Sequence, residues 1–343
     1  MPSAPLRASS APKSVVTGGA GFIGSHLVDH LLGLGHEVVV VDNFCTGRDA
    51  NLAHVAGRIA VVRADVADLE TIAPAFAGAS YVFHLAGLAD IVPSIERPMD
   101  YFHANAEGTA SVMEAARRAG VAKVVYTASS TCYGLPDVVP TPETAEIRTQ
   151  FPYALTKHLG ELTALHWGRV YGIPTIALRL FNVYGPRSRT SGAYGAVFGV
   201  FLAQKLAGKP FTVVGDGKQT RDFTFVTDVV EAFAAAALSD VADEVFNVGS
   251  GGTYSIHELV TRLGGDIVYV PKRPGEPDAT FADVSKIERV LGWRARVPFA
   301  EGVTRMLAAI DMWREAPVWD EASIARATEA WFENLGEKSA AAR

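Results

Sequence analysis

The sequence has few of the features that mark disulfide-rich, metal-binding or membrane-spanning proteins. Only two cysteines occur in its 343 residues, Cys45 and Cys132, and no Cys-x-x-Cys spacing is present. We therefore expect reduced, buried cysteines and no metal site. No apolar run reaches the roughly 18 residues of a membrane span. The net charge of −6 argues against a general binder of nucleic acids or membrane surfaces, so a cytoplasmic protein is expected.

The length of the chain suits one large domain or two closely packed ones. Residues 1–12 are rich in Ala, Ser and Pro and contain no apolar h-region, which predicts a flexible N-terminal tail and no secretory signal. The stretch that begins at Trp313 is helical in pattern and carries no functional signal. Residues 336–343, rich in alanine, are expected to form a second flexible tail.

Short apolar strands are expected to alternate with helices through the first half of the chain. Continuous apolar runs such as Val38–Val41 fit strands that are covered on both faces. Such alternation predicts an α/β fold with a doubly wound parallel sheet of the Rossmann type. The expected strands are Ser14–Thr17, Glu37–Val41, Ile59–Arg63, Tyr81–His84, Lys123–Ala128 and Thr175–Leu180; the expected helices are Phe22–Leu34, Asp68–Phe76, Ala104–Ala119 and Tyr153–Tyr171.

The regular alternation weakens after Leu180, where Gly and Pro become dense. This change predicts a smaller, mixed α/β lobe over residues 181–221 and 251–335. Val226–Leu238 and Glu244–Val248 again have the patterns of a helix and a strand. Residues 222–250 are therefore expected to return to the domain formed by residues 13–180.

A glycine-rich turn joins the first expected strand to the first helix. Gly18, Gly21 and Gly24 have no side chains, so the backbone can close on a pyrophosphate there while the helix directs its N-terminal N–H groups at the phosphates. A glycine-rich string alone could be a structural turn. Here the strand, the helix and an acid about twenty residues on, Asp42, supply the context that dinucleotide binding requires.

Two acidic residues mark the ends of the next two expected strands. Asp42 can accept hydrogen bonds from an adenine-ribose diol and would repel a 2′-phosphate, which favours NAD over NADP. Arg48 is a nearby cation that argues the other way. Asp65, followed by Val66, lies where the adenine edge would be, although it could equally cap a loop.

A proton-transfer group is indicated by the only Tyr-x-x-x-Lys of the chain, Tyr153 to Lys157. A free tyrosine, with a pKa near 10, is a poor base at neutral pH. Lys157 lies one helical turn later on the same face, so its charge is expected to favour the phenolate. Ser129, at the end of the preceding strand, could orient a substrate hydroxyl toward Tyr153. The alternative is a tyrosine that only packs.

With these features in place, the chain resembles the extended short-chain dehydrogenase/reductase family, in its nucleotide-sugar epimerase/dehydratase branch. The resemblance spans Lys13 to about Trp313 and depends on motifs that occur in a fixed order. They are Thr17–Gly24, Val41–Asn43, His84–Gly87, Asn105–Thr109, Ser129–Gly134, Tyr153–Lys157, Leu178–Arg187, Gly215–Val226 and Arg273–Glu276.

The resemblance implies a catalytic set of Ser129, Tyr153 and Lys157, and it implies which residues bind the ligands. NAD would be contacted by Gly18, Gly21, Phe22, Ile23, Gly24, Asp42, Asn43, Thr46, Gly47, Asp65, Val66, Leu85, Ala86, Gly87, Asn105, Thr127, Tyr153, Lys157 and Val183. A nucleoside-diphosphate sugar would be contacted by Ser129, Ser130, Tyr153, Asn182, Ala196, Val197, Thr212, Val214, Arg221, Arg273, Glu276 and Thr280. Among these, Arg221 and Arg273 would bind the diphosphate and Glu276 the nucleotide ribose.

The shared first step implied by the resemblance is removal of the proton from the sugar 4-hydroxyl by tyrosine, while the C4 hydride passes to NAD. Dehydratases, and often decarboxylases, place an acid in the segment where this chain has Ser130 and Thr131. The implied reaction is therefore 4-epimerisation, as for UDP-glucose and UDP-galactose. A UDP-glucuronate 4-epimerase, a 4,6-dehydratase, a decarboxylase and a non-catalytic NAD-binding regulator remain as alternatives.

Two positions bear on the size of the sugar that the site could accept. A small residue at Thr280 would leave room for a 2-acetamido group, and Ala89 stands where classical galactose epimerases have lysine. UDP-N-acetylhexosamines are therefore possible substrates.

The resemblance also implies a homodimer through the helices that carry Asn105–Ala119 and Tyr153–Tyr171. The apolar residues of these helices, Ala115, Ala116, Leu159, Leu162 and Leu165, could equally face the sheet.

Overall fold

The computed structural model describes residues 11–188 and 196–336. The tails predicted at 1–12 and 336–343 fall almost entirely outside these ranges. No helix in the described part of the chain is long and apolar enough to cross a membrane. Among the same residues, no three His, Cys, Asp or Glu side chains are grouped so that they could hold a metal ion.

A seven-stranded sheet forms the centre of the molecule, and every neighbouring pair of its strands is parallel. The predicted α/β fold class with a Rossmann-type sheet is confirmed. Its strand order is β11-β6-β5-β4-β1-β2-β3, so the chain winds outward in both directions from β1. The strands are β1 (Lys13–Thr17), β2 (Glu37–Asp42), β3 (Ile59–Arg63), β4 (Tyr81–His84), β5 (Lys123–Ser129), β6 (Thr175–Leu180) and β11 (Glu244–Val248).

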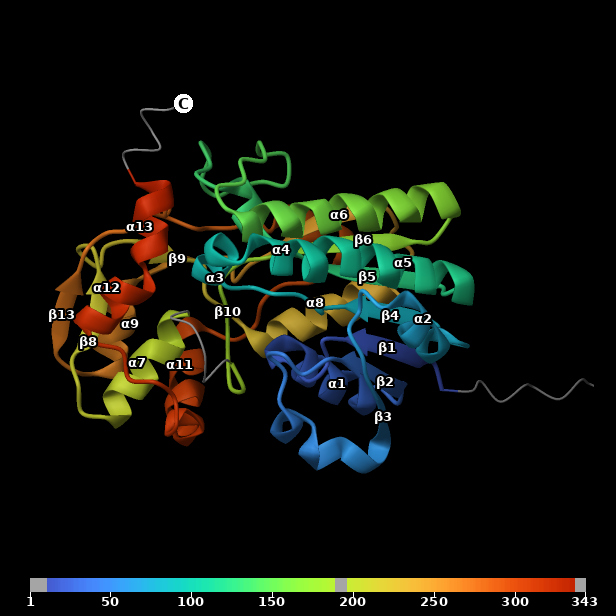
Figure 1. The fold of residues 1–343 in the computed structure, drawn as a ribbon, viewed down its shortest axis with the longest axis horizontal. Helices are drawn as coiled ribbons and strands as arrows, with labels where there is room; N and C mark the ends of the chain where they lie inside the picture. The colour runs from blue at the N-terminus through green and yellow to red at the C-terminus, as the bar shows by residue number, and fades with distance from the viewer. Residues whose placement is uncertain (1–10, 189–195, 337–343) are drawn as a thin grey trace, which may run out of the picture.

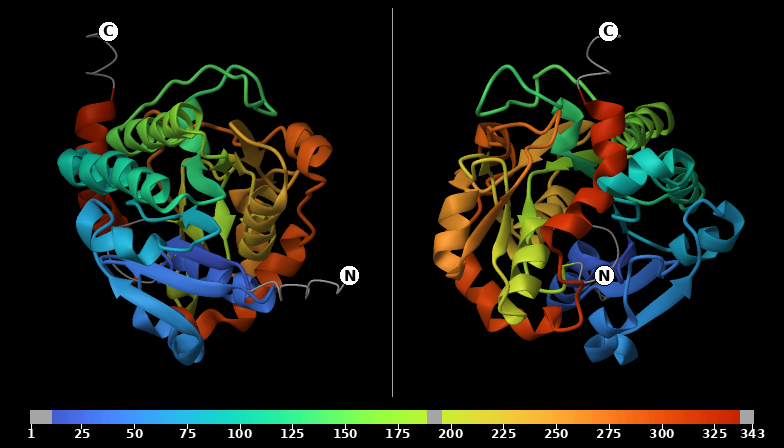
Figure 2. Two further views of the ribbon diagram at one scale, coloured as in Figure 1. Left: turned by 90° about the vertical axis from the view of Figure 1, so that its right-hand side faces the viewer. Right: turned by 60° about the vertical axis from the view of Figure 1, so that its left-hand side comes forward.

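Helices cover both faces of this sheet, as Figures 1 and 2 show. On one face α1 (Phe22–Gly33) packs against α8 (Val226–Leu238), and both bury apolar side chains against the strands. On the other face lie α5 (Gly108–Ala119) and α6 (Pro152–Tyr171), with the short helix α2 (Leu69–Ile72) beside α5. This double covering explains why the strands are continuously apolar.

A second lobe lies beyond the carboxyl ends of β5 and β6 (Figure 1). Its small sheets pair β8 (Phe211–Val214) with β13 (Ile267–Val270), and β9 (Thr220–Arg221) with β12 (Tyr254–Ser255). The core of this lobe combines many aromatic residues with aliphatic ones. The remaining elements around it are β7 (Val183–Tyr184), β10 (Thr224–Phe225), α7 (Val197–Leu206), α9 (Ile256–Leu263), α10 (Ser285–Leu291), α11 (Phe299–Ala308), α12 (Glu321–Ala327) and α13 (Glu329–Leu335).

The domain of the main sheet and the second lobe are connected through residues 222–250, which were predicted to return to the domain of the main sheet. Strand β11 pairs with β6 at the edge of the main sheet, and α8 packs against α1. The domain boundaries at residues 180 and 250 stay predictions. The position of β11 and α8 means that the second lobe is tied to the sheet by several chain crossings.

Helix boundaries differ from the prediction in two places. The segment expected as one helix over Ala104–Ala119 is preceded by α3 (Ile91–Glu96) and α4 (Pro98–Tyr101), and it begins as a π-helical turn over Phe102–Glu107 before α5. The segment Asp68–Phe76 divides into α2 and a 3-10 turn, because Pro74 lacks the N–H that a continuous helix needs.

Candidate active site

One continuous cleft of about 650 Å³ lies at the carboxyl ends of the parallel strands, between the sheet and the second lobe. Ligands of open α/β sheets bind at this edge because the loops that follow the strands converge there. The cleft is lined by loops after β1, β2, β3, β4 and β5, by the start of α6, and by segments of the second lobe.

The glycine-rich turn after β1 forms one end of the cleft. Gly18 has a φ of +71°, a conformation that side chains disfavour. A Cβ on Gly24 would lie 2.1 Å from the carbonyl oxygen of Gly18, so only glycine permits the close packing of this turn on α1. The N-terminal end of α1 therefore opens into the cleft, as binding of a pyrophosphate requires.

Asp42 is held rigidly at the end of β2. Its carboxylate accepts hydrogen bonds from the backbone N–H of Ala20 at 2.9 Å and of Phe44 at 2.8 Å. Burial raises the pKa of Asp42, and these backbone donors oppose the rise. Asp65 lines the cleft one strand further along and accepts a bond from Asn43 at 2.9 Å. Both carboxylates lie where the adenosine half of a dinucleotide would be recognised.

The middle of the cleft contains a polar atom that a cofactor could satisfy. Thr127 Oγ1 is buried and has no hydrogen-bond partner among residues 11–188 and 196–336. Buried hydroxyls are rarely left unbonded, so this orphan points to a ligand. Thr127 lines the cleft between the glycine turn and the catalytic residues. The glycine turn, Asp42 and this hydroxyl together fit NAD.

The predicted catalytic residues meet where β5 ends and α6 begins. Tyr153 Oη donates a hydrogen bond to Ser129 Oγ at 3.3 Å, and Lys157 lies one turn further along α6. All three side chains line the cleft. The Lys157 ammonium lies 4.5 Å from the ring centroid of Tyr126, and its side chain is almost fully buried. The sequence-based grouping of these residues therefore corresponds to one site.

The pKa values of this group depend mainly on burial. Burial lowers the pKa of Lys157 to about 7, although Glu161 opposes the fall. Burial raises the pKa of Tyr153 above its usual value, and the hydrogen bond with Ser129 opposes that rise. The expected stabilisation of the phenolate by Lys157 is thus not the dominant influence, because desolvation disfavours the charged form of both groups.

The segment after β5 carries hydroxyl groups. It forms a 3-10 turn over Ser130–Tyr133, and Thr131 Oγ1 lies 2.8 Å from Ser129 Oγ. Ser130 and Thr131 both line the cleft. The segment in which the resemblance led us to expect an acid in dehydratases therefore carries the hydroxyl of Thr131, which is hydrogen-bonded to Ser129.

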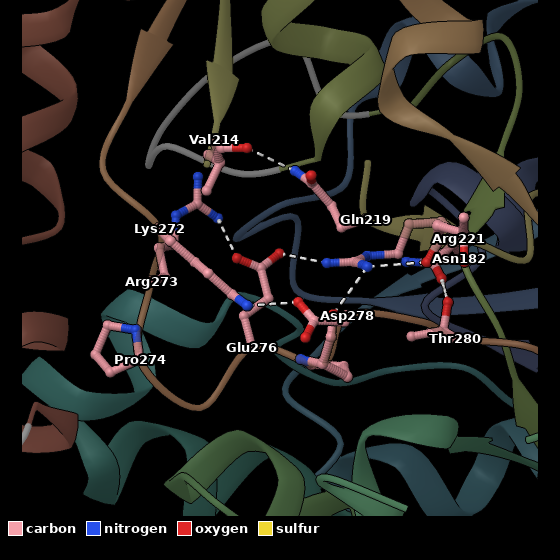
Figure 3. A network of polar contacts seen from close by, with 12 residues as sticks. Asn182, Val214, Gln219, Arg221, Lys272, Arg273, Pro274, Glu276, Asp278 and Thr280 are labelled. Atoms are coloured by element: carbon pink, nitrogen blue, oxygen red, sulfur yellow. Dashed lines mark hydrogen bonds and ion pairs between the residues drawn. The ribbon is translucent and has the colours of Figure 1, made fainter. Parts of the chain in front are cut away.

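Two arginines and a glutamate form the far end of the cleft (Figure 3). Arg221 Nη2 lies 2.7 Å from Glu276 Oε1, and Arg273 Nη1 lies 3.8 Å from Glu276 Oε2. Arg221 and Arg273 are largely buried, so their charges are only weakly screened by solvent. In an acidic protein, this pair is a local cationic site of the kind that a diphosphate requires.

Most of the predicted binding residues line the cleft, but three do not. Gly47 lies behind Asp42, and a Cβ there would contact that carboxylate at 2.9 Å. The buried side chain of Asn105 bonds the backbone of Leu88 and the hydroxyl of Thr156, so it shapes the loop after β4. Thr280 Oγ1 donates a bond to Asn182 Oδ1 at 2.7 Å, and Asn182 faces the cleft (Figure 3).

Two tryptophans in the cleft wall were missed by the sequence analysis. Trp319 and Trp331 line the cleft, although they belong to the C-terminal stretch that showed no functional signal. That stretch, which was expected to be helical, forms α12 and α13. The available signal was the presence of three tryptophans, Trp313, Trp319 and Trp331, in this short stretch. Asp90 and Arg187 also line the cleft.

The glycine turn leads to a first prediction. Gly24→Ala is expected to abolish retention of the dinucleotide, because its Cβ would overlap the Gly18 carbonyl and force the turn open. Gly33→Ala is the matched control, since it lies on the same helix with no atom near the added Cβ. Cofactor binding and thermal melting of both variants would be measured. Full cofactor retention by Gly24→Ala would contradict the role assigned to the turn.

Comparisons with known proteins agree with this site. The model of the NAD dependent epimerase/dehydratase family matches residues 14–249. The chain is 38% identical over 304 residues to a UDP-glucose 4-epimerase of Mycolicibacterium smegmatis, covering 85% of this chain and 96% of that protein. It is 36% identical over 307 residues to UDP-glucuronic acid decarboxylase 1 of Arabidopsis thaliana, covering 86% and 68%. The solved structure of a Thermus thermophilus UDP-glucose 4-epimerase in complex with NAD matches with a TM-score of 0.79 at 34% identity, covering 89% and 100%.

Proposed function

The chain belongs to the NAD-dependent epimerase/dehydratase family, whose cofactor is NAD, and on this premise we propose that it is an isomerase that inverts C4 of a nucleoside-diphosphate sugar. The observation that carries this proposal is the hydroxyl at Thr131, bonded to Ser129 in place of a carboxylic acid. Proton removal at C4 is served by Ser129 and Tyr153. Elimination of water would need a further acid at this segment.

The residues of the chain supply orientation and proton transfer. Ser129, within 3.3 Å of Tyr153, is placed to align the 4-hydroxyl of the sugar with the tyrosine oxygen. NAD bound in this cleft would supply the hydride acceptor for C4 and the donor for its return. Tyr153 takes the proton of the sugar 4-hydroxyl and later returns it. Arg221 and Arg273 hold the diphosphate while the keto sugar rotates and presents its other face to the same site. Lys157 faces the same part of the cleft and would bond the nicotinamide ribose.

Related proteins include decarboxylases, so the test must distinguish the reaction classes. The purified enzyme would be incubated with UDP-glucose, UDP-N-acetylglucosamine and UDP-glucuronate, and with dTDP-, GDP- and CDP-sugars. Separation followed by mass analysis is expected to give a product of unchanged mass that elutes separately. Loss of water would identify a dehydratase, loss of carbon dioxide a decarboxylase, and either result would overturn the proposal. Turnover of UDP-glucuronate without loss of mass would select the uronate epimerase.

We propose that the sugar pocket also accepts a 2-acetamido group. Thr280 does not line the cleft, so its small size would act through Asn182, which it holds by a hydrogen bond. Ala89 also lines the cleft, and its small side chain occupies little of that volume. Turnover of UDP-N-acetylglucosamine is expected, and activity on UDP-glucose alone would contradict this part of the proposal.

We further propose a homodimer through α5 and α6. Ala115, Ala116 and Leu165 face the sheet, so they do not supply the expected apolar surface. Leu162 on α6 is 50% exposed, and Leu155 and Val170 on the same helix are also exposed. Analytical ultracentrifugation is expected to show a dimer that Leu162→Glu converts to a monomer. A wild-type monomer at micromolar concentration would contradict this assembly.

A further inference from the structure

The C-terminal helix α13 places a tryptophan in the wall of the cleft. Trp331 is only 4% exposed, although it lies close to the end of the described chain. It lines the same cleft as Tyr153 and Arg273. Helix α13 lies C-terminal to residues 14–249, which the family model matches. A buried tryptophan that faces a ligand cleft from the end of the described chain therefore needs a physical explanation of its own.

The indole of Trp331 contacts the loop that carries one of the diphosphate arginines. Its Nε1 donates a hydrogen bond to the carbonyl oxygen of Pro274 at 2.8 Å. The guanidinium carbon of Arg273 lies 5.4 Å from the centroid of the indole ring, within range of a cation–π interaction. Two adjacent residues of this loop are therefore fixed by one side chain. Figure 3 shows Arg273 beside Glu276, with Pro274 next to it in the chain.

The same indole also contacts the segment that begins α6. The ring centroid of Phe151 lies 6.2 Å from that of Trp331. Phe151 in turn stacks on Tyr153, at 6.4 Å with an interplanar angle of 7°. Helix α13 also packs against α3, which follows the cleft-lining loop after β4. Trp331 thus bridges the catalytic side of the cleft and the arginine loop of the second lobe.

A tryptophan that only stabilised α13 would be expected to pack among apolar side chains of the second lobe. Trp313, in the same C-terminal region, does this: it is buried in the aromatic core of the lobe and does not line the cleft. The neighbours of Trp331 are a cation, a loop carbonyl and the aromatic residue beside the catalytic tyrosine. This difference distinguishes a positioning role from a packing role.

We propose that Trp331 is a positioning residue that orients the Arg273 guanidinium toward the diphosphate of the substrate, so that α13 completes the substrate-binding end of the cleft. The inference assumes the nucleoside-diphosphate substrate of the proposed function. In addition to the ion pair with Glu276, the indole face and the Pro274 bond restrict both the Arg273 guanidinium and its loop. Positioning before binding reduces the ordering that the substrate must impose.

The test compares Trp331→Leu, Trp331→Phe and Trp313→Leu in the full-length holoenzyme. Trp331→Leu is expected to raise KM for the nucleotide sugar, and Kd for UDP, by about tenfold, while kcat changes less than threefold. Trp331→Phe retains an aromatic face and is expected to recover part of the affinity. Trp313→Leu is expected to lower the melting temperature with little change in KM or in the Kd for UDP.

A double-mutant cycle with Arg273→Met shows whether Trp331 acts through the arginine. In the Arg273→Met background, Trp331→Leu is expected to change the Kd for UDP less than twofold. Full additivity of the two changes, or an unaltered Kd for UDP in Trp331→Leu, would overturn the proposal. Because the UDP titration does not require turnover, its result stands apart from whether the wild-type enzyme epimerises any sugar.

Discussion

Replacement of Tyr153 by phenylalanine is expected to lower kcat about a thousandfold while the protein remains folded and binds both ligands. The side chain loses only its hydroxyl, which bonds Ser129 and is the group placed to exchange a proton with the substrate. A positioned acid–base group contributes about 10²- to 10⁴-fold to the rate. The stacking of the ring on Phe151 would be retained, so the fold should be preserved. Steady-state turnover and thermal melting would be measured together.

Tyr101→Phe is the matched control for this prediction. Tyr101 packs edge-on against Tyr153, with ring centroids 6.3 Å apart, but it does not line the cleft. Its phenol is buried, and burial raises its pKa well above the usual value, so it stays protonated. We expect Tyr101→Phe to keep most of the activity. Retention of more than a tenth of kcat by Tyr153→Phe would remove the tyrosine from the proton-transfer step.

The main sheet could be predicted from the sequence because most of its strands, other than the edge strand β3, are largely buried. Continuous apolar runs such as Val38–Val41 are typical of strands in a covered parallel sheet. The glycine turn after β1 needs residues without side chains at fixed positions. The grouping of Tyr153 with Lys157 was predicted for a related reason. The four-residue spacing of Tyr153 and Lys157 places them on one face of a helix whatever surrounds that helix.

Contacts between distant segments could not be predicted in this way. Nothing in the sequence shows that Trp331 contacts Arg273, 58 residues earlier in the chain, because no local periodicity reports on it. The side chain of Thr280 was expected to face the sugar, yet it bonds Asn182. The pKa of Tyr153 was misjudged for the same reason. Charge proximity can be inferred from spacing, but desolvation depends on every segment that covers the site.

The burial of Lys157 leads to the second large prediction, in which one substitution removes activity and stabilises the protein. Lys157→Met is expected to lower kcat by at least about a hundredfold, because the ammonium beside the catalytic tyrosine is lost. The variant should nevertheless unfold at a higher urea concentration at pH 6. Methionine fills a similar volume without the cost of burying a charge. Glu161 keeps a partner, since its carboxylate remains paired with Arg179 at 2.6 Å.

The sign of the pH dependence follows from the direction of the pKa shift. In the folded protein the pKa of Lys157 falls to about 7 from its ordinary 10.5. Between these values the unfolded chain holds a proton that the folded chain does not, so wild-type stability gains up to about 1.4 kcal/mol per pH unit as the pH rises. Below pH 7 both states are charged and the burial cost is complete. The advantage of Lys157→Met should therefore be greatest at pH 6 and shrink toward pH 10.

Lys123→Met provides the contrasting control, because the side chain of Lys123 is as little exposed as that of Lys157 but its ammonium donates hydrogen bonds. Its ammonium donates hydrogen bonds to the carbonyl oxygens of Ser239 and of Val241, the latter at 2.9 Å, so methionine would leave partly buried acceptors without this donor. Loss of such partners costs about 1–3 kcal/mol, and this variant should be less stable than wild type while remaining active. Urea unfolding of the cofactor-depleted proteins from pH 6 to 9.5 would measure both effects. A Lys157→Met variant that is less stable than wild type at pH 6 would mean that contacts of the ammonium outweigh its desolvation.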